Sequence, residues 1–417
     1  MRNSRNKLGR RQFVEHVSKG LLAAGGALSV GQVNRNEAAE PLEPSDSKAK
    51  TMPTVVLGRT DLRVSRISLG TNPPTSRSVL AYCAEQGVTY MDSAMGYANG
   101  RAEAGLGEML KELGLDRRKF CLSTKSYERD PSKWPSLVAE SVKRLQTDHV
   151  ELFFVHDLGI HQRQDSDQDS TWINKREVVE GAKALKKSGL VRHFGFSVHH
   201  RRPEHTFGLL YESAKSEVVD VIMVQYNFRD EKNEPLREAI AAARKAQIGI
   251  IACKPVGGNQ PIPNNLKTYL SDGFNRWQAA IRWLANNPLV DVVCANMLTV
   301  EQAKENIAAI KAPPLRADDL QMLRMYALAT ANLSCGQCGT CLKVCPQQLN
   351  IPRILRARMY HANYGLPELG QETYASIPTA ERADRCLCDG ACEKVCPNGV
   401  TIRKHLAHAA EMFGASV

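Results

Sequence analysis

The chain has little that would suit a nucleic-acid-binding or membrane-spanning protein. Of its net charge of +11, residues 1–35 carry +6, from seven Lys or Arg against one Glu, so the other 382 residues carry only +5. No basic patch with interleaved aromatic residues remains in the body of the chain, which argues against a nucleic-acid partner. The apolar stretch from Gly20 to Val30 is too short to cross a bilayer as a stable helix, so we expect no membrane span.

The charged N-terminus resembles an export signal. Arg10 and Arg11 precede a short, mildly apolar stretch rich in Gly and Ala, which is the layout of a twin-arginine signal. A disordered basic tail is the alternative. Residues 31–52 are polar, contain two prolines and are expected to form a linker. We therefore expect the twin-arginine translocation (Tat) machinery to export the protein to the periplasm or another extracytoplasmic compartment.

Residues 54–311 alternate short apolar, β-branched runs with amphipathic stretches. Near-continuous apolar strands separated by helices indicate a parallel sheet buried on both faces. The expected strands are 64–69, 88–92, 119–124, 149–155, 191–196, 219–224, 248–253 and 290–294, and the expected helices are 77–86, 101–113, 135–145, 176–188, 204–215, 234–246, 274–287 and 300–311. Eight such pairs in about 250 residues predict an α/β fold, a (β/α)₈ TIM barrel. An open doubly wound sheet is the alternative, but no Gly-x-Gly-x-x-Gly follows the first strand, which disfavours its nucleotide-binding version.

Four polar residues lie just past three successive strands of this barrel: Asp92, Tyr97, Lys125 and His156. Active sites of such barrels lie at the C-terminal ends of the strands. A lysine kept charged by a carboxylate lowers the pKa of a nearby tyrosine, which makes the tyrosine a better general acid for reducing a carbonyl. Each residue also has an ordinary explanation, such as a core histidine, a capping lysine or a packed tyrosine. Together they predict a catalytic group for a small carbonyl or alcohol substrate.

The same segments resemble the aldo-keto reductase family. "VVLGRTDLRVSRISLGT" is similar to that family's N-terminal hairpin and first strand, "DSAMGY" to its Asp-to-Tyr motif, and "GRAEAGLGEML" to the helix that follows. The resemblance implies a nicotinamide-dependent oxidoreductase over about residues 54–311, with the four residues as the catalytic tetrad and Tyr97 as the proton donor.

The resemblance also implies where NAD(P)H binds. The matching segments are "GFSVHH", "VQYN", "ACKPVGGNQ" and "TVEQAKEN", and the implied cofactor-binding residues are Ser197, Gln225, Lys254, Gly257, Gly258, Gln302, Glu305 and Asn306. Where many members place a nicotinamide-stacking tyrosine, this chain has Cys253. Where many place Lys, Ser and Arg around the adenosine 2′-phosphate, the aligned residues are Asn296, Met297 and Gln302. These residues lack the positive charges that a phosphate prefers, so the sequence does not favour NADPH over NADH as the cofactor. Thr299 and Gln302 also form a predicted capping box.

Eight of the twelve cysteines lie between residues 335 and 396. "CGQCGTCLKVCP" is the run in which bacterial ferredoxins bind 4Fe–4S clusters, three cysteines to one cluster and the fourth to another. Zinc and disulfides are the alternatives, which the regular Pro-terminated spacing disfavours. The tail resembles the two-cluster ferredoxin-like domain that follows the barrel in one branch of aldo-keto reductases. That resemblance implies one cluster on Cys335, Cys338, Cys341 and Cys396, and another that includes Cys345, Cys386 and Cys392.

The second motif, "CLCDGACEKVCP", has Asp389 where the first has Cys338, and a cysteine one place earlier. Cys388, Asp389 or no residue could complete this cluster. Thiolate is the softer ligand and Gly390 gives the backbone freedom, so Cys388 is the expected ligand.

The expected organisation is a signal and linker over 1–52, a barrel over 53–315 and a dicluster domain over 316–417. We expect an exported NAD(P)H-dependent oxidoreductase with two 4Fe–4S clusters, for which a redox partner is possible. A barrel that no longer turns over and serves as a scaffold for an electron-transfer module is the alternative function.

Overall fold

A computed structural model describes residues 51–159, 169–199, 203–261, 266 and 271–414. These residues all belong to one compact unit, Lys50–Val417. The predicted export signal lies outside the described residues. Among the helices that are described, none is long and apolar enough to cross a membrane.

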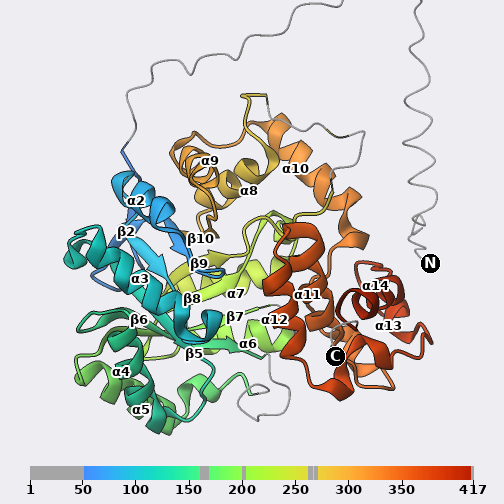
Figure 1. The fold of residues 1–417 in the computed structure, drawn as a ribbon, viewed down its shortest axis with the longest axis horizontal. Coiled ribbons are helices and arrows are strands. Elements are labelled where there is room, and N and C mark those ends of the chain that lie inside the picture. The colour runs from blue at the N-terminus through green and yellow to red at the C-terminus, as the bar shows by residue number, and fades with distance from the viewer. Residues whose placement is uncertain (1–50, 160–168, 200–202, 262–265, 267–270, 415–417) are drawn as a thin grey trace, which may run out of the picture. The chain divides into compact units, whose positions relative to one another are not determined.

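Eight parallel strands close into a barrel in the order β10-β3-β4-β5-β6-β7-β8-β9, which confirms the predicted (β/α)₈ fold (Figure 1). The strands are β3 (Ile67–Gly70), β4 (Tyr90–Asp92), β5 (Cys121–Ser126), β6 (Val150–Leu158), β7 (Val191–Val198), β8 (Val219–Gln225), β9 (Gly249–Cys253) and β10 (Val292–Asn296). Each overlaps an expected strand. The first begins later than expected, because Arg63–Ser65 forms a separate strand, β2, which pairs antiparallel with β1 (Thr54–Val56).

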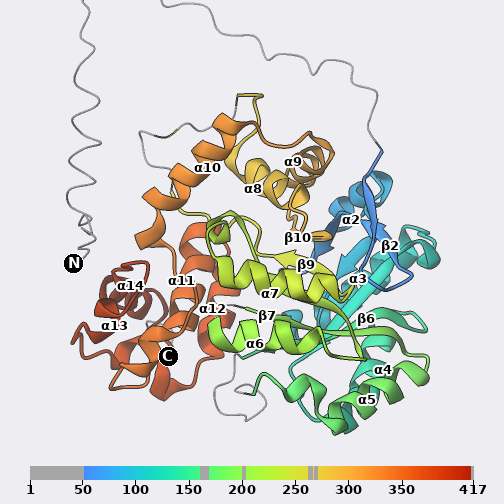
Figure 2. The same cartoon turned by 180° about the vertical axis from the view of Figure 1, so that it is seen from behind.

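A helix follows each strand of the barrel, and Figure 2 shows these helices from the other side. They are α2 (Arg77–Glu85), α3 (Arg101–Glu112), α4 (Trp134–Arg144), α5 (Arg176–Lys187), α6 (Pro203–Ser213), α7 (Glu234–Lys245), α8 (Arg276–Ala285) and α9 (Val300–Lys311). Side-chain caps explain where several of these helices begin. At α2, Ser76 accepts a hydrogen bond from the N–H of Val79, and at α9, Thr299 accepts one from the N–H of Gln302. The predicted capping box at α9 forms only in part, because the Gln302 side chain accepts from the N–H of Leu298 instead of Thr299.

The β1–β2 hairpin packs against the N-terminal end of the barrel. Leu57, Leu62 and Val64 are buried with the side chains that fill the barrel interior. Gly58 has φ +57°, and a Cβ there would lie 2.1 Å from the backbone nitrogen of Gly249, so only glycine fits. The hairpin therefore closes the end opposite to the C-terminal ends of the strands.

After the barrel the chain is helical. The segments are α10 (Ala317–Ala329), α11 (Ile351–Tyr364), α12 (Pro367–Ala375), α13 (Ala391–Lys394) and α14 (Ile402–Gly414). Helices α11, α12 and α14 share a hydrophobic core that includes Ile354, Tyr374, Leu406 and Phe413. Two of the motif cysteines, Cys341 and Cys392, are buried in this core.

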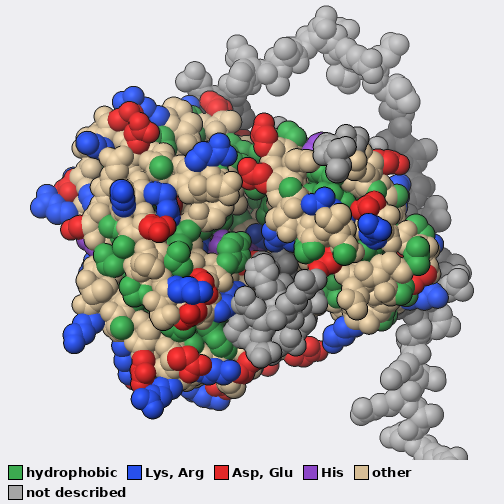
Figure 3. Space-filling view, turned by 60° about the horizontal axis from the view of Figure 1, so that its bottom comes forward, with side chains coloured by type: hydrophobic (Ala, Val, Ile, Leu, Met, Phe, Trp, Pro, Cys, Tyr) green, Lys and Arg blue, Asp and Glu red, His purple; other side chains and the backbone are tan. Residues whose placement is uncertain are grey.

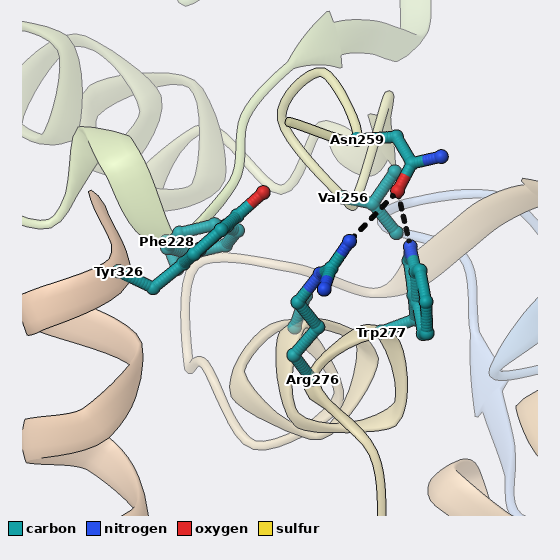
Figure 4. A pocket seen from close by; sticks show the side chains of 7 residues that line it. Phe228, Val256, Asn259, Arg276, Trp277 and Tyr326 are labelled. Carbon is teal, nitrogen blue, oxygen red and sulfur yellow. Dashed lines mark hydrogen bonds between the residues drawn. The ribbon is translucent and has the colours of Figure 1, made fainter. Parts of the chain in front are cut away.

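A small cavity lies where α10 meets the barrel (Figure 4). Asn259 accepts hydrogen bonds from Arg276 at 3.2 Å and from Trp277 at 2.9 Å, and the Tyr326 ring packs beside Phe228. Its volume of about 10 Å³ holds at most about one water molecule. This junction is therefore structural, and a substrate needs another cavity.

Candidate functional site

The structure gathers the predicted catalytic side chains at one rim of the barrel. Asp92 is the last residue of β4, Lys125 lies in β5 and His156 in β6, while Tyr97 begins a short 3₁₀ helix (Tyr97–Gly100) after β4. Parallel strands in register bring these ends together. The four side chains therefore lie close together because the closed parallel barrel aligns the ends of its strands.

Lys125 and Asp92 form a buried ion pair. The Lys125 ammonium donates to Asp92 Oδ2 at 2.7 Å and to the carbonyl oxygen of Ser93 at 2.6 Å. The side chains are 0% and 3% exposed. Ser123 donates a further hydrogen bond to Asp92 Oδ1 at 2.7 Å. This network pairs the Lys125 ammonium and fixes its position, as burial of an ionic group requires.

Tyr97 and His156 face each other beside this pair. Their ring centroids are 5.7 Å apart at 76°, and the Lys125 Nζ lies over the Tyr97 ring at 5.0 Å from its centroid. Tyr127 also stacks on His156, with ring centroids 4.3 Å apart. His156 Nδ1 is buried without a hydrogen-bond partner in the described structure. Such an orphaned polar atom at a cavity wall suits a bound oxygen or N–H group.

The electrostatics differ in one respect from the prediction. Burial, with a contribution from the Asp92 charge, raises the pKa of Tyr97 well above its ordinary value, so the expected lowering of this pKa by Lys125 is wrong. Lys125 directs its charge at Asp92 and Ser93, which explains why burial prevails. Burial, helped by the Lys125 charge, lowers the pKa of His156 well below its usual range. Both Tyr97 and His156 are therefore neutral near pH 7.

A cavity of about 920 Å³ opens at this rim, within the range of roughly 300–1,000 Å³ typical of ligand pockets. Asp92, Tyr97 and His156 line its barrel side. Its other side consists of tail residues, among them Arg356, Tyr360 and Tyr364 of α11. In a space-filling view one face of the molecule is hollowed near its centre, where hydrophobic, His, and Lys or Arg side chains are visible (Figure 3). The sequence did not predict that the tail would help to form this cavity.

The predicted cofactor-binding residues divide into two groups. Those that line the cavity are Ser197, Lys254, Gln302, Glu305 and Asn306. Those that do not are Gln225, Gly257 and Gly258. The Gln225 side chain accepts a hydrogen bond of 3.4 Å from Arg356, and a Cβ on Gly258 would lie 3.5 Å from Met359 of α11. The tail therefore contacts barrel positions that the family resemblance assigns to the cofactor.

Two of the residues aligned with the adenosine 2′-phosphate, Asn296 and Met297, also differ in whether they line the cavity. Asn296 lines the cavity, and its side-chain amide donates to the carbonyl oxygen of Asn72. Met297 is fully buried and its sulfur lies 3.9 Å from that of Cys83. Of the three aligned residues, Asn296 and Gln302 can therefore face a ligand in this cavity, and Met297 cannot.

The sequence analysis did not identify a second group of interacting polar side chains in the cavity wall. His199 Nδ1 lies 2.5 Å from Asp157 Oδ1, and His199 Nε2 lies 3.8 Å from the sulfur of Cys253. All three residues are buried and line the cavity. His199 follows β7, Asp157 belongs to β6 and Cys253 ends β9. The rule that active-site residues lie at the C-terminal ends of the strands, which identified the tetrad, could therefore have identified them too.

The motif cysteines lie close to one another. Burial, followed by the thiols of Cys338 and Cys396 among other neighbouring groups, raises the pKa of Cys335. Burial, followed by Glu393 and then the thiols of Cys386 and Cys345, raises the pKa of Cys392 to about 11. Cys341 interacts with Cys392 as well as with Cys335, Cys338 and Cys396, so the pairing that the resemblance implies stays a prediction. In the described ranges no three Cys, His, Asp or Glu side chains are placed to share a single metal ion.

The odd cysteine of the second motif lies beside Cys386. Cys388 is exposed, has φ +57°, and its sulfur lies 3.9 Å from that of Cys386. Asp389 follows at the position that Cys338 holds in the first motif.

Comparisons with known proteins agree with this architecture. Residues 56–261 match the model of the aldo/keto reductase family, and residues 302–400 match that of a 4Fe–4S dicluster domain. An uncharacterized oxidoreductase of Bacillus subtilis, YqkF, is 26% identical over 65% of this chain and 95% of its own length. A probable voltage-gated potassium channel subunit beta of Arabidopsis thaliana is 25% identical over 62% of this chain and 91% of its own.

A solved structure has the same barrel fold. An aldo-keto reductase from Klebsiella pneumoniae in complex with NADPH has a TM-score of 0.54 and 22% identity, over 67% of this chain and 96% of its own. The two family models, the relatives and this fold together support an aldo/keto reductase barrel, of an oxidoreductase family, followed by a 4Fe–4S dicluster domain.

Proposed function

We propose that the protein interconverts a carbonyl compound and an alcohol with NAD(P)H at the mouth of its barrel. The observation that carries this proposal is the convergence of Tyr97, His156 and the Lys125–Asp92 pair on one cavity of about 920 Å³. The relatives that are oxidoreductases, and the NADPH bound to the Klebsiella aldo-keto reductase, support it.

The residues of the chain position the substrate and move its proton. Bound NAD(P)H supplies the hydride. Tyr97 stays protonated at neutral pH and gives its proton to the oxygen of the reduced carbonyl, and the neutral His156 orients that oxygen. In the reverse direction Tyr97 accepts the proton. Lys125, fixed by Asp92, provides a positive charge beside the tyrosine as negative charge develops.

The donor set at the cavity fits a nicotinamide cofactor. Ser197, Gln302, Glu305 and Asn306 supply polar groups along the wall, and the cavity is large enough for a cofactor to enter with a small substrate. Lys254 adds a positive charge at the same wall, which suits phosphate groups.

Arg356 suggests the class of substrate. This arginine of α11 lines the cavity, is 8% exposed, and its Nε has no hydrogen-bond partner in the described structure. A buried guanidinium always carries its charge and pairs best with a carboxylate or phosphate. We propose that the substrate carries such an anionic group.

The tail is proposed to hold two 4Fe–4S clusters. The fit rests on the two cysteine motifs and on backbone N–H groups that point at their sulfurs: that of Gln337 at Cys335 and that of Val400 at Cys396, both at 3.4 Å. Such clusters are assembled in the cytoplasm, so an exported protein that carries them must cross the membrane folded. The paired arginines at residues 10 and 11 support a twin-arginine route to an extracytoplasmic compartment.

A non-catalytic scaffold is the second candidate, and the potassium channel subunit among the relatives favours it. Titration of purified protein with NADH and NADPH, followed by carbonyl reduction assays, separates the two. Saturable binding with turnover supports the enzyme. Binding without turnover of any aldehyde, ketone or oxo acid, together with intact clusters, supports the scaffold.

A further inference from the structure

The two cysteine motifs belong to an internal repeat with an offset of 51 residues. Cys335, Cys341 and Cys345 correspond to Cys386, Cys392 and Cys396, and Ile351 at the start of α11 corresponds to Ile402 at the start of α14. The position of Cys338 corresponds to Asp389, and that of Gln337 to Cys388.

The backbone follows the same path in both copies. Gln337 and Cys388 have φ +59° and +57°, Gly339 and Gly390 have +73° and +76°, and a third pair, Gln348 and Gly399, has +53° and +62°. A non-glycine residue with positive φ is uncommon. Because Cys388 and Gln337 share this conformation, they occupy the same turn position in the two copies of the repeat. The register of the second loop is therefore the same as that of the first, without a shift by one residue.

The contacts of Cys388 are those of a turn residue. Its N–H donates to the sulfur of Cys386 at 3.4 Å, as the N–H of Gln337 donates to Cys335 at 3.4 Å. Its side chain also points at that sulfur, 3.9 Å away, as the Gln337 amide points at Cys335 at 3.3 Å. Each iron of a 4Fe–4S cluster takes one protein ligand, and two sulfurs almost in contact cannot each serve a separate iron.

The contacts of Asp389 are those of a ligand position. In the first motif the hydroxyl of Thr340 contacts the Cys338 sulfur at 3.3 Å. In the second, the N–H of Ala391, at the position of Thr340, donates to Asp389 Oδ1 at 3.1 Å. Within the described residues no ion pair engages Asp389, whereas the nearby Glu393 is held by Arg403. The carboxylate therefore stands where the first motif has its thiolate, with an oxygen left to bind iron.

We propose that Asp389 is the fourth protein ligand of the second cluster, and that Cys388 is a free thiol that donates to the Cys386 sulfur. This reverses the expectation based on ligand softness, because backbone register decides which side chain reaches the cluster. It rests on the proposal that the tail binds 4Fe–4S clusters. A carboxylate binds this iron less firmly than thiolate does, and Asp389 is exposed. The iron at this corner is therefore the one that the protein loses first on oxidation.

Alkylation of the intact full-length holoprotein tests the inference without a mutation. Anaerobic iodoacetamide, followed by peptide mass spectrometry, should label Cys388 while Cys386 and Cys392 stay protected until the cluster is removed. Protection of Cys388 equal to that of Cys386 would overturn the assignment.

Iron counts and EPR spectra of variants give a second readout, with Cys388→Ala as the matched control for Asp389→Ala. Cys388→Ala should keep the wild-type iron content, Asp389→Ala should hold one iron fewer and show a three-iron signal, and Asp389→Cys should resist loss of iron to ferricyanide. Iron loss in Cys388→Ala, or unchanged iron in both alanine variants, contradicts the inference alone. Wild-type protein without inorganic sulfide would overturn the cluster proposal and this inference with it.

Discussion

The Lys125 ammonium lies 2.7 Å from the Asp92 carboxylate, and both side chains are almost completely shielded from solvent. Removing one member of a buried pair leaves an uncompensated charge. We therefore expect Asp92→Asn to lower the free energy of unfolding by about 3–5 kcal/mol.

Urea unfolding monitored by circular dichroism measures this effect. Glu180→Gln is the control, because it removes an exposed i,i+4 ion pair with Arg176 whose contribution is about 0.3–0.5 kcal/mol. Equal effects of the two substitutions would mean that the Lys125–Asp92 pair is not a buried, structured element.

Cofactor preference should follow from the residues that the family resemblance aligns with the adenosine 2′-phosphate. Asn296 and Gln302 line it, and neither offers the positive charge that a 2′-phosphate prefers. NADH should therefore bind at least as tightly as NADPH in a fluorescence titration. A tenfold preference for NADPH, about 1.4 kcal/mol, would show that another basic group reaches the phosphate.

Arg356 should control the affinity for anionic substrates. Replacing Arg356 by Gln removes a charge-assisted contact, so KM for a carbonyl substrate with a carboxylate should rise by roughly tenfold or more, because such contacts contribute about 1.5–3 kcal/mol. KM for the corresponding uncharged substrate should change little. If KM changes equally for both substrates, Arg356 has only a structural role.

His405 makes stability depend on pH. Burial, with a contribution from the Arg358 charge, lowers the pKa of His405 from 6.5 to about 4. The unfolded chain therefore binds a proton below pH 6.5 that the folded chain does not, and stability falls as the pH drops from 6.5 towards 4. The loss by pH 5 should be about 2 kcal/mol.

Urea unfolding at pH 7 and pH 5 checks the pH effect by comparing wild type with His405→Gln. The wild type should lose more stability than the variant, while Glu180→Gln, which removes an exposed ion pair of the barrel, should behave as wild type. Cluster loss in acid affects all three proteins, so only the difference between them is informative. An identical pH dependence in wild type and His405→Gln would contradict the assignment.

The barrel and the meeting of the tetrad could be predicted because both follow from local patterns. Apolar runs of strand length alternate with helical periodicity, and the closed parallel topology then brings Asp92, Lys125 and His156 to one rim. The packing of Arg356 into the cavity left no local signal, because it depends on contacts between residues more than a hundred positions apart, such as that with Gln225.

Two further features needed the structure for different reasons. The raised pKa of Tyr97 reflects burial, which the sequence does not reveal. The register of Cys388 could have been inferred, because the 51-residue repeat aligns it with Gln337 and not with Cys338.

The substitution Tyr97→Phe tests the central claim most directly. It removes the hydroxyl that donates the proton and keeps the ring that packs beside His156. The exposed Tyr211→Phe serves as the control. For Tyr97→Phe we expect kcat for carbonyl reduction to fall by roughly 10²-fold or more, the usual contribution of a general acid, with unchanged NAD(P)H affinity and iron content. Turnover by Tyr97→Phe equal to that of wild type would contradict the account, because the proton would then come from another group.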